Sequence, residues 1–394
     1  MTEARLARAV AWVGDEAVAE AVMQCDVDVV AAYPITPQTI IVEKLAEYVA
    51  NGEFKGEFVA VESEHSALSA CLGAAATGAR VFTATSSQGL ALMHEIMYNA
   101  SGMRLPIVMA VANRALSAPL VLNADHGDMM GSRDSGWIQV YAEDVEEIYD
   151  RTIQLFKLSE DPGVLLPSAI NFEGFILSHD LENVRPLPTD AVHRFLGRPN
   201  AKYRLDPSDP TTFGAIATHD SYYEFRMQQV EAMERALDAF RRMEDEYEAI
   251  SGRRYGAVDA YNTQGADCVA VVNGCTAGTM RAAAKEINRA GGNVGVLAVK
   301  LYRPFPSEDI LKHLEGAKVA IVMDRSLSLG APSAPLAEDV GAALRAGGRN
   351  LRLLSVIYGI GGRDFSVTDG RRVFDLAKGG FELSRKPVMY GVKE

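Results

Sequence analysis

The sequence has 394 residues, 48% of them hydrophobic, and a formal net charge of −13. A chain of this length can bury a large core, and the usual domain size of about 100–200 residues predicts two domains. The acidic balance argues against nucleic acid and anionic membrane as partners, because both require basic residues that neutralise phosphate. No stretch reaches the run of about 18 apolar residues that is typical of a membrane span.

The N-terminal stretch and the cysteines indicate the cellular compartment. MTEARLARAVAWVGDEAVAE contains acidic residues and no unbroken apolar run, so it does not resemble a signal peptide, and we expect a cytoplasmic protein. Cys25, Cys71, Cys268 and Cys275 are widely spread, form no C-x-x-C pair and match neither a zinc site nor an iron–sulfur site. If the chain takes part in redox chemistry, we expect the metal to lie on another chain.

In residues 1–180, apolar segments rich in Val, Ile and Ala alternate with segments of helical period. The apolar segments are continuous rather than alternating, which is typical of a parallel sheet covered on both faces. The pattern therefore predicts a βα-repeating domain. Its expected strands are 27–32, 58–61, 80–84, 107–112, 137–141 and 164–171, and its expected helices are 16–25, 39–50, 65–76, 90–100 and 145–159.

Residues 181–264 have a different character. Their first part, 181–214, is rich in proline and polar residues and predicts an extended connector. In 221–250, apolar residues recur every three or four positions, which predicts an amphipathic helix, and Ser221 with Glu224 fits a capping box at its start. Because the polar face carries both charges, we expect this helix to pack on a domain or a neighbouring subunit rather than on a membrane.

A second alternation of strand and helix patterns occupies residues 265–394 and predicts a smaller doubly wound domain. The expected fold class is therefore α/β with two doubly wound domains. The expected strands are 268–272, 294–299, 319–323 and 351–357, and the expected helices are 277–290, 308–313 and 334–344.

Eight motifs are distributed along the chain between Ala32 and Asp364. They are AYPITPQT, VESEHSA, TATSSQGLALMHE, SGMRLPIVM, ANRALSAP, DHGDMMGSRDSGWIQVYAE, LYRPFP and GIGGRD. In this order they resemble the alpha subunits of the 2-oxoacid:ferredoxin oxidoreductases, and those of pyruvate:ferredoxin oxidoreductase most closely. The resemblance implies that residues 1–180 form a domain like the pyrimidine-binding domain of thiamine diphosphate enzymes. It implies that residues 265–394 resemble the transketolase C-terminal domain.

The diphosphate and magnesium signature of such enzymes, a G-D-G followed at a distance by paired asparagines, is absent from the sequence. The nearest tripeptides, at 14–16, 127–129 and 368–370, each lack one glycine. We therefore expect a partner subunit to share the thiamine diphosphate and to hold its Mg²⁺. The same absence argues against a thiamine decarboxylase or synthase that is complete in itself.

Glu64 is the first catalytic candidate. In FVAVESEHSALSA a strand is expected to end near Val61 and a helix to begin near His65, so Glu64 lies at the first helical turn, where the positive helix end favours a carboxylate. From the residues alone, a helix-capping acid is the favoured interpretation. The resemblance implies that it hydrogen-bonds N1′ of the aminopyrimidine of thiamine diphosphate. Glu62 is the second candidate for that role.

The AYPITP segment follows an expected strand, and its two prolines predict a stiff loop. From the residues alone, Thr36 could cap the helix that follows, and Tyr33, Pro34 and Ile35 could be core residues. The resemblance implies instead that these three line the pyrimidine pocket and that Thr36 presents its hydroxyl to the carboxylate or keto oxygen of the substrate.

Arg114 also follows an apolar strand. A guanidinium at this position can hold a carboxylate through two hydrogen bonds, although a surface salt bridge is the ordinary alternative. The resemblance places Arg114 on the carboxylate of the 2-oxoacid, with Asn113 orienting it.

Other motifs carry less specific expectations. The backbone amides of 86–89 open a helix and could meet a polar ligand atom. Asp125, His126, Asp128 and Asp134 lie close together but without a usual metal-ligand spacing, so we expect no metal there. The resemblance implies that this segment is a structural loop near the active site. The glycines of 274–278 predict an ordinary strand-to-helix turn. LYRPFP and GIGGRD are expected to form loops of the second domain that contact partner subunits.

The resemblance also implies the reaction: oxidative decarboxylation of pyruvate with coenzyme A to acetyl-CoA and CO₂. Electrons would pass through 4Fe–4S clusters on partner subunits, of the beta, gamma and delta types, to ferredoxin. Two alternatives stay open. One is the same chemistry on 2-oxoglutarate, a branched-chain oxoacid or oxalate, and the other is a non-catalytic subunit that only binds its partners.

Overall fold

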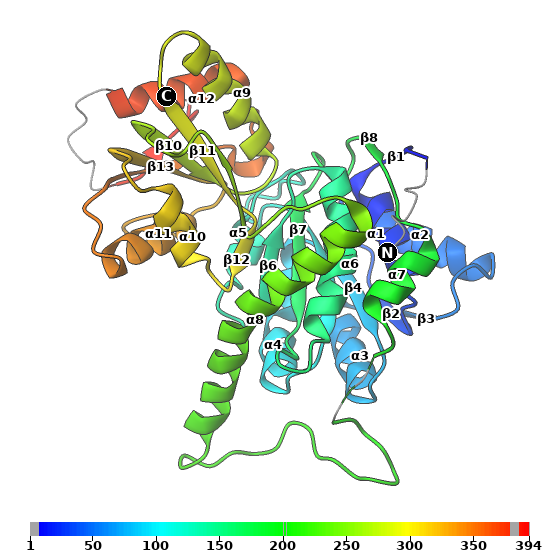
Figure 1. Ribbon diagram of the computed structural model, residues 1–394. Coiled ribbons are helices and arrows are strands. Elements are labelled where there is room, and N and C mark those ends of the chain that lie inside the picture. The colour runs from blue at the N-terminus through cyan, green and yellow to red at the C-terminus, as the bar shows by residue number, and fades with distance from the viewer. Residues whose placement is uncertain (1–7, 200, 202, 379–385, 394) are drawn as a thin grey trace.

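The computed structural model describes residues 8–199, 201, 203–378 and 386–393. The first residues of the N-terminal stretch and parts of the connector and of the last segment, namely 1–7, 200, 202, 379–385 and 394, lie outside the described residues. The described chain forms two large sheets flanked by helices, one of seven strands and one of six, and a separate two-stranded sheet (Figure 1). This confirms the expected α/β class.

The first sheet has the order β12-β6-β7-β5-β4-β2-β3 and is parallel except for β12. The central strands β5 and β7 are buried at every residue, as the continuous apolar runs predicted. The strands are β2 (Val29–Ala32), β3 (Glu57–Ala60), β4 (Val81–Thr85), β5 (Ile107–Asn113), β6 (Ile138–Tyr141), β7 (Ser168–Glu173) and β12 (Leu301–Arg303).

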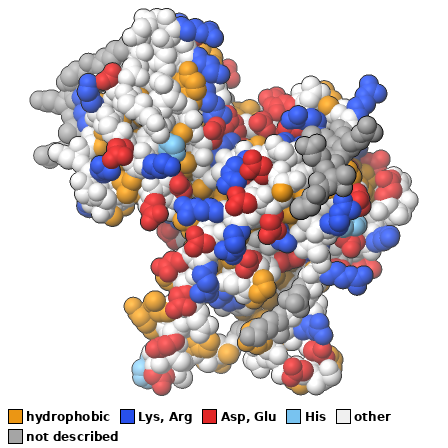
Figure 2. Space-filling view, viewed as in Figure 1, with side chains coloured by type: hydrophobic (Ala, Val, Ile, Leu, Met, Phe, Trp, Pro, Cys, Tyr) orange, Lys and Arg blue, Asp and Glu red, His pale blue; other side chains and the backbone are white. Residues whose placement is uncertain are grey.

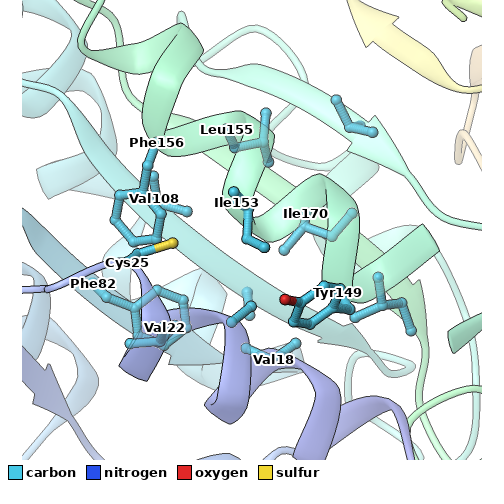
Figure 3. Packing of buried hydrophobic residues seen from close by; sticks show 14 of the residues in the cluster. Val18, Val22, Cys25, Phe82, Val108, Tyr149, Ile153, Leu155, Phe156 and Ile170 are labelled. Atoms are coloured by element: carbon cyan, nitrogen blue, oxygen red, sulfur yellow. The ribbon is translucent and has the colours of Figure 1, made fainter. Parts of the chain in front are cut away.

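Helices cover both faces of this sheet. On one face, α1 and α6 pack together and bury Val18, Val22, Tyr149 and Ile153 against sheet residues such as Ile170 (Figure 3). The small side chains of α3 pack with α4 in a separate core cluster. The helices are α1 (Gly14–Gln24), α2 (Thr39–Ala50), α3 (Glu64–Ala76), α4 (Ser87–Gly102), α5 (Gly127–Met130) and α6 (Val145–Ser159).

The second sheet has the order β15-β14-β13-β10-β11-β9, in which only β9 is antiparallel to its neighbour. Its strands are β9 (Val258–Tyr261), β10 (Cys268–Val272), β11 (Val294–Val299), β13 (Val319–Asp324), β14 (Arg352–Ile357) and β15 (Val388–Met389). The helices of this half are α9 (Thr276–Arg289), α10 (Ser307–His313), α11 (Pro335–Ala346), the short 3₁₀ helix η1 (Ile360–Gly362) and α12 (Val367–Lys378).

Several short elements differ from the expectations. Within 181–214, expected to be an extended connector, β8 (Glu182–Val184) pairs with β1 (Val10–Trp12), and helix α7 (Thr189–Leu196) buries Val192 and Phe195. LYRPFP was expected to form a loop, but its first residues form β12, which joins the first sheet at the edge next to β6. These elements depend on pairing with distant segments, which the local pattern does not contain. The boundaries at residues 180 and 265 stay a prediction.

The long helix α8 (Tyr222–Ser251) is buried against the first domain from Ala232 onward, and Gln229 before it donates to the Ser101 hydroxyl at the end of α4. Phe240, Met243 and Tyr247 are buried against α6 and α7, whereas the first turns project from the body as an arm (Figure 1). Apolar side chains gather on this arm in Figure 2, and the exposed ones include Tyr223 and Phe225. The capping box expected at its start is wrong, because Ser221 makes no side-chain capping hydrogen bond.

The surface and the helices can be compared with the expectation from composition that neither nucleic acid nor a membrane is a partner. The face of the molecule in Figure 2 mixes acidic and basic side chains without a continuous basic area. In the part of the chain that the structure describes, no helix combines the length and hydropathy needed to cross a bilayer.

Candidate active site

The candidate site lies at the carboxyl edge of the first sheet. The YPITP loop follows β2, the turn at 86–89 follows β4, and Arg114 follows β5. Because β5, β4 and β2 are parallel neighbours, their carboxyl ends meet at one edge, and α3 begins at the same edge after β3. The topology therefore brings together residues that are far apart in sequence, as such sites do in open α/β sheets.

Arg114 connects the loops that follow three strands. Its Nη1 donates to the backbone oxygen of Thr36 at 2.5 Å, and its Nη2 donates to Oε1 of Gln88 at 2.8 Å. The residue is 5% exposed, which excludes the surface salt bridge considered above. Burial lowers the pKa of Arg114, and the negative charges of Asp128 and Glu64 oppose this shift. Arg114 and Glu64 therefore lie near each other at this edge of the sheet.

The YPITP loop is held by hydrogen bonds that Gln38 donates to its backbone oxygens. The backbone N–H of Gln38 donates to the backbone oxygen of Ile35 at 3.0 Å, and its side-chain Nε2 donates to the backbone oxygen of Tyr33 at 2.9 Å. Gln38, not Thr36, is the N-cap residue of α2, and no side chain caps that helix. Thr36 is exposed, so its hydroxyl is accessible to a small molecule.

The apolar residues of the loop are not core residues. Tyr33 is 37% exposed, Pro34 is exposed and Ile35 is half-buried. Only Pro37 packs inward, where a Cβ on Gly174, after β7, would lie 2.6 Å from its Cγ. The three residues expected to line a pocket therefore present apolar surface at the edge where Arg114 lies.

Glu64 is the first residue of α3 and is only 7% exposed. It is not the helix cap: Ser63 occupies that position, and its hydroxyl accepts from Ser66 N at 3.2 Å. Among the residues that the structure describes, none donates a hydrogen bond to the Glu64 carboxylate. Glu62 is exposed instead, and its carboxylate accepts from the Ser66 hydroxyl. A buried carboxylate without an internal donor fits a donor that comes from a ligand.

There is room for the Glu64 carboxylate because the adjacent residue, Gly89, has no side chain. A Cβ on Gly89 would lie 2.6 Å from Oε1 of Glu64 and 2.5 Å from Oγ1 of Thr85. The Thr85 hydroxyl is itself buried and has no partner among the described residues. These features fit the aminopyrimidine of thiamine diphosphate, whose N1′ requires a carboxylate that is kept away from water.

The carboxylates of the acidic segment after β5 make hydrogen bonds and ion pairs within the chain. Asp128 is bound by backbone amides, His126 pairs with Glu173 at 3.1 Å, and Asp125 accepts from Gly127 N at 2.7 Å. Asp134 is exposed. Within the described ranges, no group of three potential metal-ligating side chains occurs.

In the turn at 86–89, two of the four backbone amides have partners within the chain, and ligand binding by the others stays a prediction. The amide of Ser87 donates to Oδ2 of Asp128 at 3.0 Å, and that of Gly89 donates to the oxygen of Ser86 at 2.9 Å. Both amides therefore have partners within the chain. The roles of Gln88, Gly89 and Asp128 could not be inferred from the sequence, because each involves a residue from another part of the chain. Gly89 meets Glu64, Gln88 accepts from Arg114 at a separation of 26 positions, and Asp128 accepts from Ser87 at a separation of 41.

The fold and the site together define an α/β protein of the thiamine diphosphate-binding type, with a buried glutamate and an arginine at one sheet edge. The chain belongs to the pyruvate flavodoxin/ferredoxin oxidoreductase family. Residues 20–247 match the family model of its thiamine diphosphate-binding region, and residues 266–369 match that of the pyruvate:ferredoxin oxidoreductase core domain II.

Three curated relatives show how much of the chain this likeness covers. Pyruvate synthase subunit PorA of Methanocaldococcus jannaschii is 48% identical, over 92% of this chain and 93% of that protein. PorA of Thermotoga maritima is 46% identical, over 99% of this chain and 100% of that protein. Ketoisovalerate oxidoreductase subunit VorA of Pyrococcus abyssi is 42% identical, over 96% and 97%.

Solved structures agree on the fold. A 2-oxoglutarate:ferredoxin oxidoreductase from Magnetococcus marinus, solved with 2-oxoglutarate, coenzyme A and succinyl-CoA, superposes with a TM-score of 0.73 at 18% identity, over 94% of this chain and 65% of that one. A split-gene transketolase, in an inactive beta4 tetramer, gives 0.54 at 12% identity, over 93% and 97%. At these identities the likeness shows the fold alone, and it confirms the transketolase-like architecture.

Proposed function

We propose that this chain is the alpha subunit of a pyruvate:ferredoxin oxidoreductase, which converts pyruvate and coenzyme A to acetyl-CoA and CO₂ in the cytoplasm and passes the electrons to ferredoxin. The observation that carries the proposal is the meeting of Glu64, Arg114 and Thr36 at one sheet edge. Near full-length similarity to pyruvate synthase subunits supports the choice of substrate.

Each of the three residues has one task in this proposal. Thiamine diphosphate, when bound, supplies the electron sink for decarboxylation. Glu64 holds N1′ of the aminopyrimidine and thereby favours the tautomer that accepts a proton at the 4′-nitrogen. Arg114 binds the carboxylate of the oxoacid, and the Thr36 hydroxyl donates to its carboxylate or keto oxygen. Tyr33, Pro34 and Ile35 cover the pyrimidine and exclude water.

The site is completed by other chains in this proposal. The partners are subunits of the beta, gamma and delta types. One of them shares the thiamine diphosphate, and Mg²⁺ and the 4Fe–4S clusters lie on these partner subunits. The missing diphosphate signature and the widely spread cysteines support this division. So does the loop that follows Arg114, where Leu116, Leu120 and Leu122 are 40%, 67% and 42% exposed, because exposed leucines beside a site favour a covering partner.

A second candidate keeps the chemistry and changes the acid. The relative that acts on ketoisovalerate is nearly as similar as the pyruvate synthases, so a branched-chain oxoacid is the main competitor, ahead of 2-oxoglutarate and oxalate. A subunit that only binds its partners would not need a buried Glu64, and this burial opposes the non-catalytic alternative.

The test uses the complex purified with its natural partner subunits. Ferredoxin reduction is measured with pyruvate, 2-oxoisovalerate and 2-oxoglutarate, each with coenzyme A, and pyruvate should give the highest kcat/KM. Glu64→Gln should lower kcat about 10²- to 10⁴-fold, the usual range for lost proton-transfer catalysis, while Glu62→Gln compares the second candidate. A near-normal rate in Glu64→Gln would overturn the assignment, and inactivity toward all three acids would overturn the function.

A further inference from the structure

The side chain of Asp128 on α5 lies beneath the candidate site and is 4% exposed. Its Oδ2 accepts from the backbone amides of Ser87 and Arg114, each at 3.0 Å. Its Oδ1 accepts from Nδ2 of Asn113 and from the Met129 amide, each at 2.8 Å. One carboxylate thus joins the start of α4 to the end of β5, at the two points from which Gln88 and Arg114 extend.

The hydrogen bond to Ser87 supports an uncommon backbone conformation. Ser87 has a φ of 49°, in the left-handed region that disfavours a residue with a Cβ. Its hydroxyl oxygen lies 2.6 Å from Oε1 of Gln88 and 2.5 Å from the oxygen of Ala115. Because Gln88 in turn accepts from Arg114, the position of Ser87 sets the position of the guanidinium.

Asp128 therefore reaches Arg114 by two routes. The direct route is the backbone amide of Arg114, which fixes where its side chain begins. The indirect route runs through Ser87 and Gln88 to Nη2, near the end of the same side chain. No ion pair between Asp128 and the guanidinium occurs in the described part of the chain, so the carboxylate orients the arginine without neutralising its charge.

We propose that Asp128 is a positioning residue for recognition of the 2-oxoacid, which it serves by holding Arg114 in the orientation that receives the substrate carboxylate. This inference rests on the proposed function. It assigns to the acidic segment a task in substrate binding that requires neither a metal nor contact with the substrate.

The test measures oxoacid kinetics in the complete complex. Asp128→Asn keeps the shape but replaces one carboxylate oxygen by an NH₂ group, which cannot accept from the two donors on that side. KM for pyruvate should therefore rise about tenfold or more, with kcat and the Kd for thiamine diphosphate changed less than about threefold. Two matched controls lie in the same segment. Asp125→Asn alters a buried carboxylate that binds backbone amides but does not contact Ser87 or Arg114, and Asp134→Asn alters an exposed one. Both should leave KM near the wild-type value.

A double-mutant cycle separates positioning from general support of the fold. In the Arg114→Ala background, Asp128→Asn should raise KM by less than about twofold, because the carboxylate acts through the arginine. An additive effect, or an unchanged KM in the single variant, would overturn the inference. If Asp128→Asn does not assemble, Asn113→Ala removes one donor to Oδ1 and keeps the charge, and it should show a smaller rise in KM with the same dependence on Arg114.

The outcomes also separate this inference from the proposed function. If the wild-type complex is active and Arg114→Ala raises KM while Asp128→Asn does not, only the positioning role fails. If no 2-oxoacid is turned over, or if Arg114→Ala leaves KM unchanged, the proposed function of Arg114 fails first.

Discussion

Arg114 donates a 2.5 Å hydrogen bond to the backbone oxygen of Thr36, a residue 78 positions earlier in the chain. The bond spans the end of β4, because β2 and β5 lie on either side of that strand. Both acceptors of the guanidinium, this carbonyl and the amide oxygen of Gln88, are neutral. In the described residues no carboxylate forms an ion pair with Arg114, so its positive charge is available to an anionic substrate.

Replacement of Arg114 by lysine is the first prediction. Lysine keeps a positive charge but loses the planar group that binds Thr36, Gln88 and a carboxylate at once. A charge-assisted hydrogen bond contributes about 1.5–3 kcal/mol, so KM for the oxoacid should rise about 10- to 100-fold, with a smaller change in kcat. Steady-state kinetics of the complex measure this. Arg242→Lys, at a side chain 62% exposed, is the control, and equal KM values in the two variants would contradict the role of Arg114.

The second prediction concerns Gly89, the third residue of α4. Alanine is the better helix former by about 1 kcal/mol, so the helix itself should tolerate the change. The added methyl would nevertheless lie 2.6 Å from Oε1 of Glu64, and the carboxylate must move. We expect Gly89→Ala to lower kcat at least about tenfold, since misplaced catalytic groups lose large factors in rate, while the complex still assembles.

Gly73 supplies the matched control, because it lies inside α3 and a Cβ there meets no atom within 4 Å. Gly73→Ala should retain the wild-type kcat and raise the melting temperature slightly. Wild-type kinetics in Gly89→Ala would mean that the position of the Glu64 carboxylate does not matter for turnover.

The sequence predicted the elements whose own residues determine them. Strands such as β5 are buried on both faces, and their unbroken apolar runs reveal both type and extent. β12 has only three residues and pairs with β6 from another part of the chain, so its existence depends on a tertiary contact. The capping box at Ser221 failed for a related reason: the motif was present, but the start of α8 projects from the body and the local backbone does not adopt a capping geometry.

The residues of the candidate site also fall into those that the sequence could identify and those that it could not. Glu64, Thr36 and Arg114 follow apolar strands, and their motifs resemble a family, so each could be named from the sequence. Asp128 could not be named in this way, because the motif D-H-G-D does not indicate that its carboxylate accepts from the amides of Ser87 and Arg114. The sequence contains the donors and the acceptor, but only the fold brings them together.

A third prediction tests the buried ion network between α6 and α8. Arg151 is fully buried and donates to Glu147 at 3.2 Å, to Glu244 at 2.5 Å and to the oxygen of Gly256 at 2.8 Å. Arg151→Met would leave two buried carboxylates without this cation, a change that costs about 3–5 kcal/mol. The midpoint of thermal unfolding should fall clearly.

Arg254→Met is the control for that experiment. Arg254 pairs with Asp245 and Glu248 at the surface with 44% of its side chain exposed, and exposed pairs contribute only about 0–1 kcal/mol. Similar losses of stability in the two variants would show that the buried network is no stronger than a surface pair.

The last prediction concerns Asp324, at the end of β13. Burial raises the pKa of this carboxyl to about 7, even though it accepts from the amides of Leu336 and Ala337 at 2.8 and 3.2 Å. An aspartate in an unfolded chain has a pKa of about 3.9, so the folded state binds this proton more tightly than the unfolded state does. Its contribution to stability is therefore present at acidic pH, is lost as the pH rises from about 4 to 7, and changes little above that.

Asp324→Asn removes this titration, so the variant should gain stability relative to the wild type as the pH rises. Melting temperatures of both proteins measured between about pH 5 and pH 8 give the difference directly, and other titrating groups cancel because both proteins contain them. Asp238→Asn, at a side chain 74% exposed on α8, is the matched control for the same substitution at the surface. A constant difference for Asp324→Asn would mean that water reaches this carboxylate in the folded protein, since desolvation is the largest cause of its raised pKa.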